Sequence, residues 1–214
     1  MKLVQEGLIA KGAEAMIYKG KFLDLPVIIK RRPPKKYRLP QIDQIIRLQR
    51  LRAEARIMTL AWQLGIRVPA LLGIDTEKRT LIIEEIQGIT LYELVVTLPE
   101  THLIPIFHEL GRQIGLLHRN DIVHGDLTVF NVIVVENIPW LIDFGLAQMT
   151  IEQEKHADDL LLFQNTLKAV SARYKDLFAG FQSIYVETNE NGPKVFEQVK
   201  KIASRARYIP KNER

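Results

Sequence analysis

Two short motifs near the middle of the chain constrain its fold more than any other feature. The first is the run His-Gly-Asp-Leu-Thr-Val-Phe-Asn, in which Asp126 and Asn131 stand five residues apart. The second, Asp143-Phe144-Gly145, begins twelve residues after Asn131, and the apolar runs 132–135 and 140–142 place both motifs at strand ends. This order is typical of phosphoryl-transfer sites, where Asp126 would orient the attacking oxygen and Asn131 and Asp143 would hold Mg²⁺ on ATP. The alternative, a turn aspartate and an Asx-turn asparagine, explains each motif alone but not the pair.

A lysine suited to holding the α- and β-phosphates lies upstream of both motifs. Lys30 ends the apolar run 27–29, which reads as a buried strand. In kinase-like sites a strand lysine grips these phosphates and is itself held by a helix glutamate. We therefore expect Lys30 and Asp126 to be the catalytic residues. The alternative for Lys30 is a solvated lysine at a strand end.

A long helix is predicted over residues 43–64, where apolar residues recur at helical period. Asp43 is the expected N-cap of this helix, and Gly65 is expected to cap its C-terminus. Glu54 lies in the middle of the helix and is the carboxylate that we pair with the strand lysine. The alternative for Glu54 is a surface ion pair with Arg50, four residues earlier.

The segment that would cover the phosphates has one glycine where three are usual. It begins at Ile9, and Gly12 is the only glycine in its turn. Because close approach to phosphate favours glycine, this loop is predicted to be stiff, with Lys11 either holding phosphate or exposed to solvent. We expect Ile9, Gly12 and Ala13 to contact the nucleotide.

Composition favours one soluble, cytoplasmic enzyme. With 214 residues the chain is long enough to bury a sizeable core, and a single domain over 1–214 is predicted. No run of 18 apolar residues is present, so no membrane span is expected, and the N-terminus lacks the layout of a signal peptide. The chain has no cysteine, which excludes disulfides, thiolate metal sites and thiol catalysis.

Basic residues account for a net charge of +5 and gather in two places. One cluster spans residues 30–38 and contains two prolines, so an extended connector is expected. The other is a basic C-terminal tail at about residues 205–214. A basic tail beside an enzyme core suits a partner with a phosphate backbone, and the alternative is a solvated helix face with a frayed end.

The predicted fold class is α+β, with a bilobal, protein-kinase-like arrangement. A small β-rich N-lobe, about residues 1–86, would contain the long helix and strand signals through residues 3–31, 71–75 and 80–86. A hinge at about residues 85–89 would follow. In a kinase-like fold the adenine lies against the hinge backbone, so Glu84 and Ile86 are the expected contacts.

The C-lobe, about residues 90–207, is predicted to be helical and reduced. Its helices are expected at roughly residues 90–97, 101–119, 156–171 and 193–207. Only about ten residues separate the Asp-Phe-Gly motif from the next helix, no Ala-Pro-Glu follows, and Gly125 stands where regulated kinases carry arginine. A full activation segment is therefore absent, and constitutive assembly or control by a partner is expected. Asp158 or Asp159 would support the catalytic loop, or cap a helix.

Several motifs together resemble one known family. They are the run Lys-Tyr-Arg-Leu-Pro-Gln-Ile-Asp at residues 36–43, the glycine-poor loop, the His-Gly-Asp-Leu-Thr sequence, the short activation segment and the basic tail. The chain resembles the atypical kinase/ATPase subunit of the KEOPS (EKC) tRNA-modification complex, in its archaeal form. The resemblance covers essentially the whole chain, and the first of these motifs discriminates best.

The resemblance implies an activity and a set of partners. The expected activity is serine/threonine phosphorylation in isolation and ATP hydrolysis within the complex, which supports threonylcarbamoyl-adenosine formation in tRNA. The expected partners are the threonylcarbamoyl-transferase metalloprotein, a small regulatory subunit on the N-lobe, and tRNA at the basic tail. Two other classes stay open: a small-molecule phosphotransferase of the aminoglycoside or choline type, and a non-catalytic nucleotide-binding scaffold.

Overall fold

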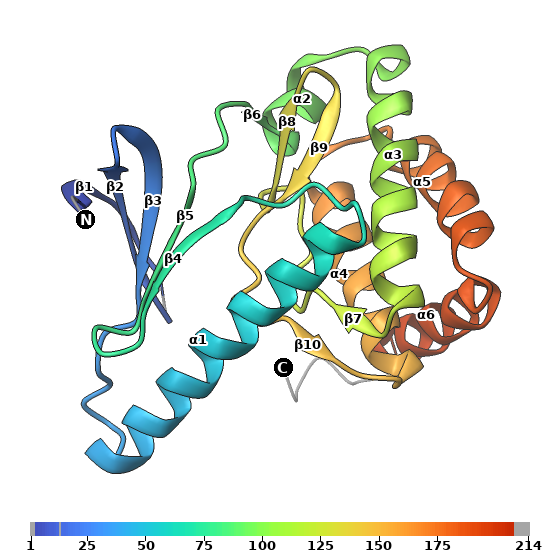
Figure 1. Cartoon of the computed structure of the whole chain (residues 1–214). Helices are drawn as coiled ribbons and strands as arrows, with labels where there is room; N and C mark the ends of the chain where they lie inside the picture. Colours follow the sequence, from blue (N-terminus) through green and yellow to red (C-terminus); the bar gives the residue numbers. More distant parts are fainter. Residues whose placement is uncertain (1–2, 13, 208–214) are drawn as a thin grey trace.

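The structure is a computed structural model that describes residues 3–12 and 14–207. A β-sheet with one long helix forms its N-terminal part, and a group of helices forms its C-terminal part (Figure 1). The predicted α+β class with two lobes is confirmed. Within the described residues, no helix is both long enough and apolar enough to cross a membrane.

The N-terminal sheet has five strands in the order β1-β2-β3-β5-β4, and every neighbouring pair is antiparallel. These strands are β1 (Leu3–Lys11), β2 (Met16–Phe22), β3 (Leu25–Arg31), β4 (Leu71–Asp75) and β5 (Thr80–Glu84). β3 is central, and its Val27 and Ile29 are fully buried, so the strand that carries Lys30 is held firmly. β1 is an edge strand whose residues are all exposed.

Helix α1 (Pro40–Gln63) begins earlier than predicted, and the assignment of Asp43 as its N-cap was wrong. Leu39 is the N-cap, and Pro40 opens the first turn because its fixed φ and missing N–H suit that position. Asp43 instead accepts a hydrogen bond from Arg47 Nε at 2.6 Å. At the other end Leu64 is the C-cap, and Gly65 follows with φ +76°, the left-handed conformation that commonly ends helices.

The C-terminal part contains five helices and five short strands among the described residues. The helices are α2 (Leu91–Thr97), α3 (Glu100–Arg119), α4 (Gln153–Val170), α5 (Tyr174–Thr188) and α6 (Gly192–Arg207). The strands are β6 (Ile89–Thr90), β7 (Ile122–Val123), β8 (Val132–Val135), β9 (Ile138–Leu141) and β10 (Gln148–Met149). Helix α5 was not predicted. It starts after Arg173 without a side-chain cap, so the usual start signal is missing.

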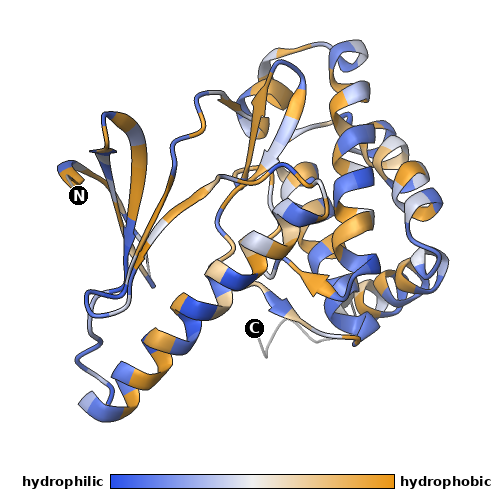
Figure 2. Cartoon of the chain, in the orientation of Figure 1, coloured by the Kyte–Doolittle hydropathy of each residue, from blue (hydrophilic) through white to orange (hydrophobic). Residues whose placement is uncertain are grey.

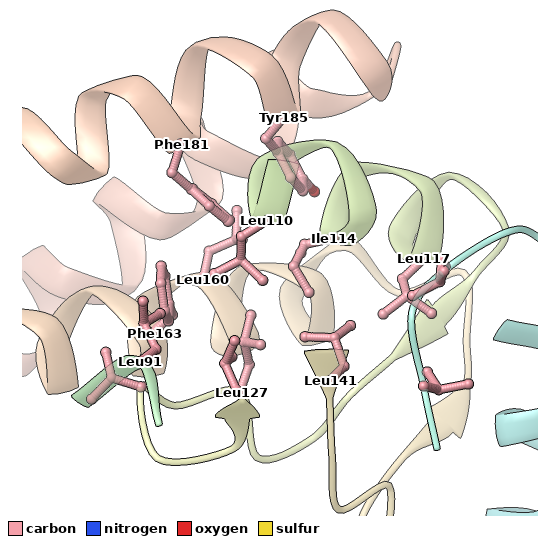
Figure 3. Packing of buried hydrophobic residues seen from close by; sticks show 14 of the residues in the cluster. Leu91, Leu110, Ile114, Leu117, Leu127, Leu141, Leu160, Phe163, Phe181 and Tyr185 are labelled. Carbon is pink, nitrogen blue, oxygen red and sulfur yellow. The ribbon is translucent and has the colours of Figure 1, made fainter. Parts of the chain in front are cut away.

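Helix α3 runs through the middle of the C-terminal core (Figure 3). Gly111 and Gly115 lie one turn apart and face α5, where an added Cβ would collide with backbone or side-chain atoms of Phe181 and Thr188. Helices α3 and α5 therefore pack closely. Figure 2 shows hydrophobic and hydrophilic residues alternating around the helices, as expected for helices that bury one face. This core forms a rigid base for the loops that follow β7 and β9.

Candidate active site

The loop between β7 and β8 presents Asp126 and Asn131 side by side. Asn131 Nδ2 donates hydrogen bonds to the backbone oxygen of Asp126 at 2.8 Å and to its Oδ2 at 2.9 Å. Both side chains are partly exposed, while Leu127 and Val129 between them are fully buried. Buried leucine and valine thus anchor the loop, and the two polar residues face outward. Since the Asn131 amide nitrogen makes both bonds, its side-chain oxygen is available to another ligand.

The β8–β9 hairpin brings Asp143 next to this loop. Ile142 N donates to the backbone oxygen of Asn131 at 3.0 Å, which joins the end of the hairpin to the start of β8. Asp143 has φ +62°, a conformation that is uncommon for a residue other than glycine and that concentrates at functional sites. Its side chain is 47% exposed, and its Oδ1 accepts the backbone N–H of Gly145 at 3.1 Å.

Lys30 joins three elements of the structure. Its Nζ lies 2.6 Å from Glu54 Oε1 on α1 and 2.5 Å from Asp143 Oδ1. Glu54 is therefore not the surface partner of Arg50, which pairs with Glu14 instead. Partial burial raises the pKa of Asp143, but the charge of Lys30 and hydrogen bonds from Lys30 and Gly145 outweigh it, so the pKa lies below its usual value.

Glu54 has a second cationic partner that the sequence analysis missed. Arg32 Nη2 lies 2.5 Å from Glu54 Oε2, and Arg32 is only 2% exposed. The signal was present in the sequence, because Lys30 and Arg32 are two residues apart on an extended segment and so point to the same face. The sequence analysis names Arg32 only as part of the basic cluster at residues 30–38, where an extended connector is expected.

Asp159, rather than Asp158, supports the catalytic loop. Asp159 Oδ2 accepts the backbone N–H of His124 at 2.6 Å, and its Oδ1 accepts that of Gly125 at 2.8 Å. Asp158 is exposed and lies 3.7 Å from Lys155 Nζ. Asp159 lies on the buried face of α4, whereas the preceding residue, Asp158, is exposed. The orientation of the helix therefore decides which of the two carboxylates reaches the catalytic loop.

His124 connects the two motifs from inside the protein. It is fully buried, and burial lowers its pKa. Its Nδ1 lies 3.3 Å from the backbone nitrogen of Asp126, and its Nε2 lies 3.1 Å from the backbone oxygen of Ile142. A neutral ring with the proton on Nε2 satisfies both contacts, because Nδ1 then accepts and Nε2 donates.

The segment that follows Asp143-Phe144-Gly145 is short and lies close to the catalytic loop. Gly125 has φ +79°, and a Cβ there would collide with the carbonyl oxygen of Leu146. Two residues further along, β10 pairs with β7. The absence of an arginine at position 125 thus has a steric cause, since the segment occupies the space that a side chain needs.

A cavity of about 350 Å³ lies between the sheet, α1 and the two motifs. Seven of the predicted site residues line it: Ile9, Lys30, Glu54, Glu84, Ile86, Asn131 and Asp143. Its walls are mainly apolar and include Ile28, Met58 and Ile133. Asp126 and Gly12 do not line the cavity, and Ala13 lies outside the described residues. The polar lining therefore includes the cluster of Lys30, Glu54, Asn131 and Asp143, together with Lys19, Glu84 and Glu85 from the sheet and the segment that follows it.

The glycine-poor loop is fixed by contacts of its own. Gly12 N donates to the backbone oxygen of Ala15 at 2.9 Å, and Glu14 forms an ion pair with Arg50 on α1. Burial raises the pKa of Glu14, but the hydrogen bond and charge of Arg50 outweigh it and lower the pKa overall. Lys11 is exposed. The loop is thus held by an ion pair rather than by glycine-rich backbone packing.

The donor set in the cavity suits Mg²⁺ bound together with a phosphate. Among the described residues, no group of three or more His, Cys, Asp and Glu side chains forms a metal site. Mg²⁺ commonly takes one or two protein oxygens and completes its shell with phosphate and water. Asp143 and the free side-chain oxygen of Asn131 offer such a pair.

Most of the predicted basic tail is outside the described residues. Helix α6 ends at Arg207, and Arg205 lies 3.7 Å from Glu154 on α4. Residues 208–214 are not described. The prediction that this tail binds tRNA therefore stays a prediction.

Comparison with known proteins identifies the family. The family model described as "RIO domain" matches residues 31–176. "KEOPS complex subunit Bud32" of Pyrococcus abyssi is 38% identical over 212 residues, which cover 94% of this chain and 96% of that protein. A "Probable bifunctional tRNA threonylcarbamoyladenosine biosynthesis protein" of Methanosphaera stadtmanae is 33% identical and one of Methanococcus maripaludis 35% identical.

The coverage differs between these relatives. The match covers 93% and 97% of this chain but only 36% and 37% of the two bifunctional proteins, so the chain spans about a third of their length. A solved structure, "WaaP in complex with acyl carrier protein", has a TM-score of 0.64 over 94% of this chain and 89% of that one. At 14% identity this likeness shows the fold alone. The chain belongs to the RIO-domain family of kinase-like proteins and to the Bud32 family.

Proposed function

We propose that this protein transfers the γ-phosphoryl group of ATP to water or to a serine or threonine hydroxyl. One observation carries the proposal. A mainly apolar cavity that suits adenine is lined also by Lys30, Asn131 and Asp143, which are the groups that a phosphoryl-transfer site requires. The apolar wall would hold the base against the backbone of Glu84 and Ile86, and these polar groups would receive the phosphates.

Each residue in the site has a role that its contacts support. Lys30 grips the α- and β-phosphates, and Glu54 keeps its ammonium group aimed into the cavity. Asp126 orients the acceptor oxygen and accepts its proton, while Asn131 fixes the Asp126 carboxylate through the 2.9 Å hydrogen bond. Asn131 and Asp143 are the proposed Mg²⁺ ligands. Bound Mg²⁺ would supply positive charge that stabilises the charge developing on the phosphates.

The short segment after Asp143-Phe144-Gly145 favours water as the acceptor. It packs against the catalytic loop at Gly125 and reaches α4 at Gln153, so little chain remains to cover the site or to align a peptide. Asp126 is partly exposed. A serine or threonine that reaches Asp126 would be phosphorylated by the same arrangement, since both acceptors offer a hydroxyl.

The relatives suggest the biological setting. We propose that the protein works in a KEOPS-type complex and supports threonylcarbamoyladenosine formation in tRNA. In the bifunctional relatives about two thirds of the chain lies outside the match, which suggests that a partner of this protein supplies the transferase. A small regulatory subunit on the N-lobe and tRNA at the basic tail complete the proposed partners.

The test is ATP hydrolysis by the purified chain, alone and with the proposed transferase partner and bulk tRNA. Asp143→Ala should abolish hydrolysis, while Asp158→Asn, which removes an exposed carboxylate from α4, should leave it unchanged. Unchanged turnover in Asp143→Ala would contradict the proposed site. Phosphate transfer to aminoglycosides or amino-alcohols, unaffected by partner and tRNA, would favour the small-molecule class. Nucleotide binding without turnover in any mixture would favour the scaffold class.

A further inference from the structure

Arg32 is a buried arginine directly after strand β3, beside the site but outside the cavity. It lies on the same face of the strand as Lys30, whereas Arg31 between them points the other way. Arg31 Nη2 lies 3.1 Å from Gln5 Oε1, and its guanidinium lies 5.5 Å from the ring centre of Tyr18. The side chains of these two neighbouring arginines therefore point to opposite faces and have different partners.

The guanidinium of Arg32 links three separate segments. Arg32 directly follows β3, its Nη2 lies 2.5 Å from Glu54 Oε2 on α1, and the same nitrogen lies 3.4 Å from the backbone oxygen of Gly145. A Cβ on Gly145 would come within 3.0 Å of Lys30 Nζ and within 3.3 Å of Arg32 Nη2. The segment after Asp143 thus fits closely against both cations.

The two oxygens of Glu54 are divided between the two cations. Lys30 takes Oε1 and Arg32 takes Oε2. Lys30 must also change partners when nucleotide binds, since its bond to Asp143 has to give way if Asp143 binds a metal. Arg32 does not need to exchange partners when nucleotide binds, because it does not line the cavity. It is thus the partner that keeps its hold on Glu54 throughout.

Arg32 retains this position at a cost. Its Nε and Nη1 are both buried and have no hydrogen-bond partner within the described structure, whereas the other arginines with such atoms, Arg31, Arg38, Arg50 and Arg79, have one each. Buried donors without partners destabilise a protein. Such a group is better explained by a task than by stability, since an apolar side chain of similar size would avoid the cost.

We infer that Arg32 is a positioning residue for phosphoryl transfer, which fixes Glu54 so that Lys30 stays aimed at the phosphates. The inference rests on the proposed function. In regulated kinases a phosphorylated activation segment holds such a site together through an arginine. The segment after Gly145 is too short for that arrangement, and here Arg32 connects it to α1 directly. The contacts of Arg32 with Glu54 and Gly145 form this connection without any need for phosphorylation.

The test compares Arg32→Met with Arg32→Lys and with the control Arg31→Met, which removes the same charge from the opposite face. In Arg32→Met, kcat for ATP hydrolysis should fall about 10- to 100-fold, while the Kd for Mg·ATP changes less than about threefold. Arg32→Lys should recover most of the loss, because a lysine keeps the charge beside Glu54. Arg31→Met should match the wild type.

Hydrogen exchange supplies a readout that does not depend on turnover. In the nucleotide-free chain, amides around Glu54 and in residues 143–147 should exchange at least about tenfold faster in Arg32→Met than in Arg31→Met. Equal exchange and equal kcat in these two variants would overturn the inference. Losses that add fully when Arg32→Met is combined with Glu54→Gln would also overturn it, since Arg32 would then act independently of Glu54.

The two proposals fail in different ways. If the wild-type chain does not turn over ATP under any condition, the proposed function fails, and the catalytic role of Arg32 fails with it. If the wild type is active and Arg32→Met keeps its kcat, only the inference about Arg32 fails.

Discussion

Asp159 Oδ2 accepts the backbone N–H of His124 at 2.6 Å, so a helix carboxylate holds the start of the catalytic loop from inside the protein. We predict that Asp159→Asn lowers the free energy of unfolding by about 2 kcal/mol, because it loses charged hydrogen bonds to two backbone N–H groups. ATP turnover should fall as well, since Asp126 follows directly. Urea unfolding and steady-state hydrolysis check this. Asp158→Asn is the matched control, and equal effects of the two changes would contradict the assignment.

Lys30 should matter more for the reaction rate than for folding. We predict that Lys30→Met lowers kcat by about 10²- to 10³-fold, because the developing charge on the phosphates loses a preorganised cation. Glu54 retains Arg32 in this variant, which limits the damage to the fold. Steady-state kinetics with thermal unfolding as a control would test this. Normal turnover in Lys30→Met would rule out the assigned role.

Stability should decline in mild acid. Burial lowers the pKa of His124, and burial together with the charge of His118 lowers that of His156, both from the ordinary value of 6.5. Because each folded pKa lies below the unfolded one, the contribution of each histidine is complete above pH 6.5 and is lost as the pH falls toward the folded pKa.

Each histidine that takes up a proton on unfolding contributes a slope of up to about 1.4 kcal/mol per pH unit. Urea unfolding from pH 5 to 8 measures that slope. His156→Phe keeps a ring stacked on His118 but cannot titrate, so the slope should become smaller. An unchanged slope in this variant would show that His156 does not contribute.

Gly125 is predicted to tolerate no side chain. Gly125→Ala should lower the free energy of unfolding by about 2 kcal/mol or more, because φ is +79° and the new Cβ meets Leu146. Gly125→Arg should fail to create a regulated enzyme for the same reason. Chemical unfolding of Gly125→Ala, beside the control Gly7→Ala, where an added Cβ meets open space, would test this. Wild-type stability in Gly125→Ala would contradict the prediction.

The ion pair of Glu14 with Arg50 should tune nucleotide binding. Glu14→Gln removes the ion pair that holds the glycine-poor loop, and we expect the Kd for Mg·ATP to rise about threefold, with little change in stability because the pair is partly exposed. Calorimetric titration with an ATP analogue measures this. Lys78→Gln is a suitable control. It removes another exposed ion pair, in which Lys78 Nζ lies 4.0 Å from Asp75 Oδ2, and neither residue lines the cavity. A matched rise in both variants would point to a general charge effect.

The sequence was sufficient to predict the parts of the site that depend on motif order. Lys30, Glu54, Asn131 and Asp143 line one cavity as the spacing of the motifs required. The strand and the helix that carry Lys30 and Glu54 were also predicted, because the apolar run 27–29 and the recurring apolar residues over 43–64 each indicated an element. The roles assigned to these residues remain predictions until activity is measured.

Other features depended on tertiary contacts that spacing does not report. The choice of Asp159 required the phase of α4 against the core. The spacing of Lys30 and Arg32 indicated a shared face, but the burial of Arg32 depends on the elements that cover that face. Helix α5 lacked a capping signal. Its close contact with α3 depends on Gly111 and Gly115, and the need for glycine there is evident only from the packing of the two helices. Asp43 failed as an N-cap because Pro40 already supplies a helix start.

Lys30, Arg32, Glu54 and Asp143 together carry two positive and two negative charges, and all but the half-exposed Asp143 are buried. Replacing any one of them with a neutral residue leaves a net charge that the surroundings cannot solvate well. A change at one position is therefore tolerated most readily when a second position of opposite charge changes with it. Because the proposed reaction also requires Lys30 and Asp143, these four sites should be kept or lost together across homologous chains, so their ancestry can be followed as one inherited unit.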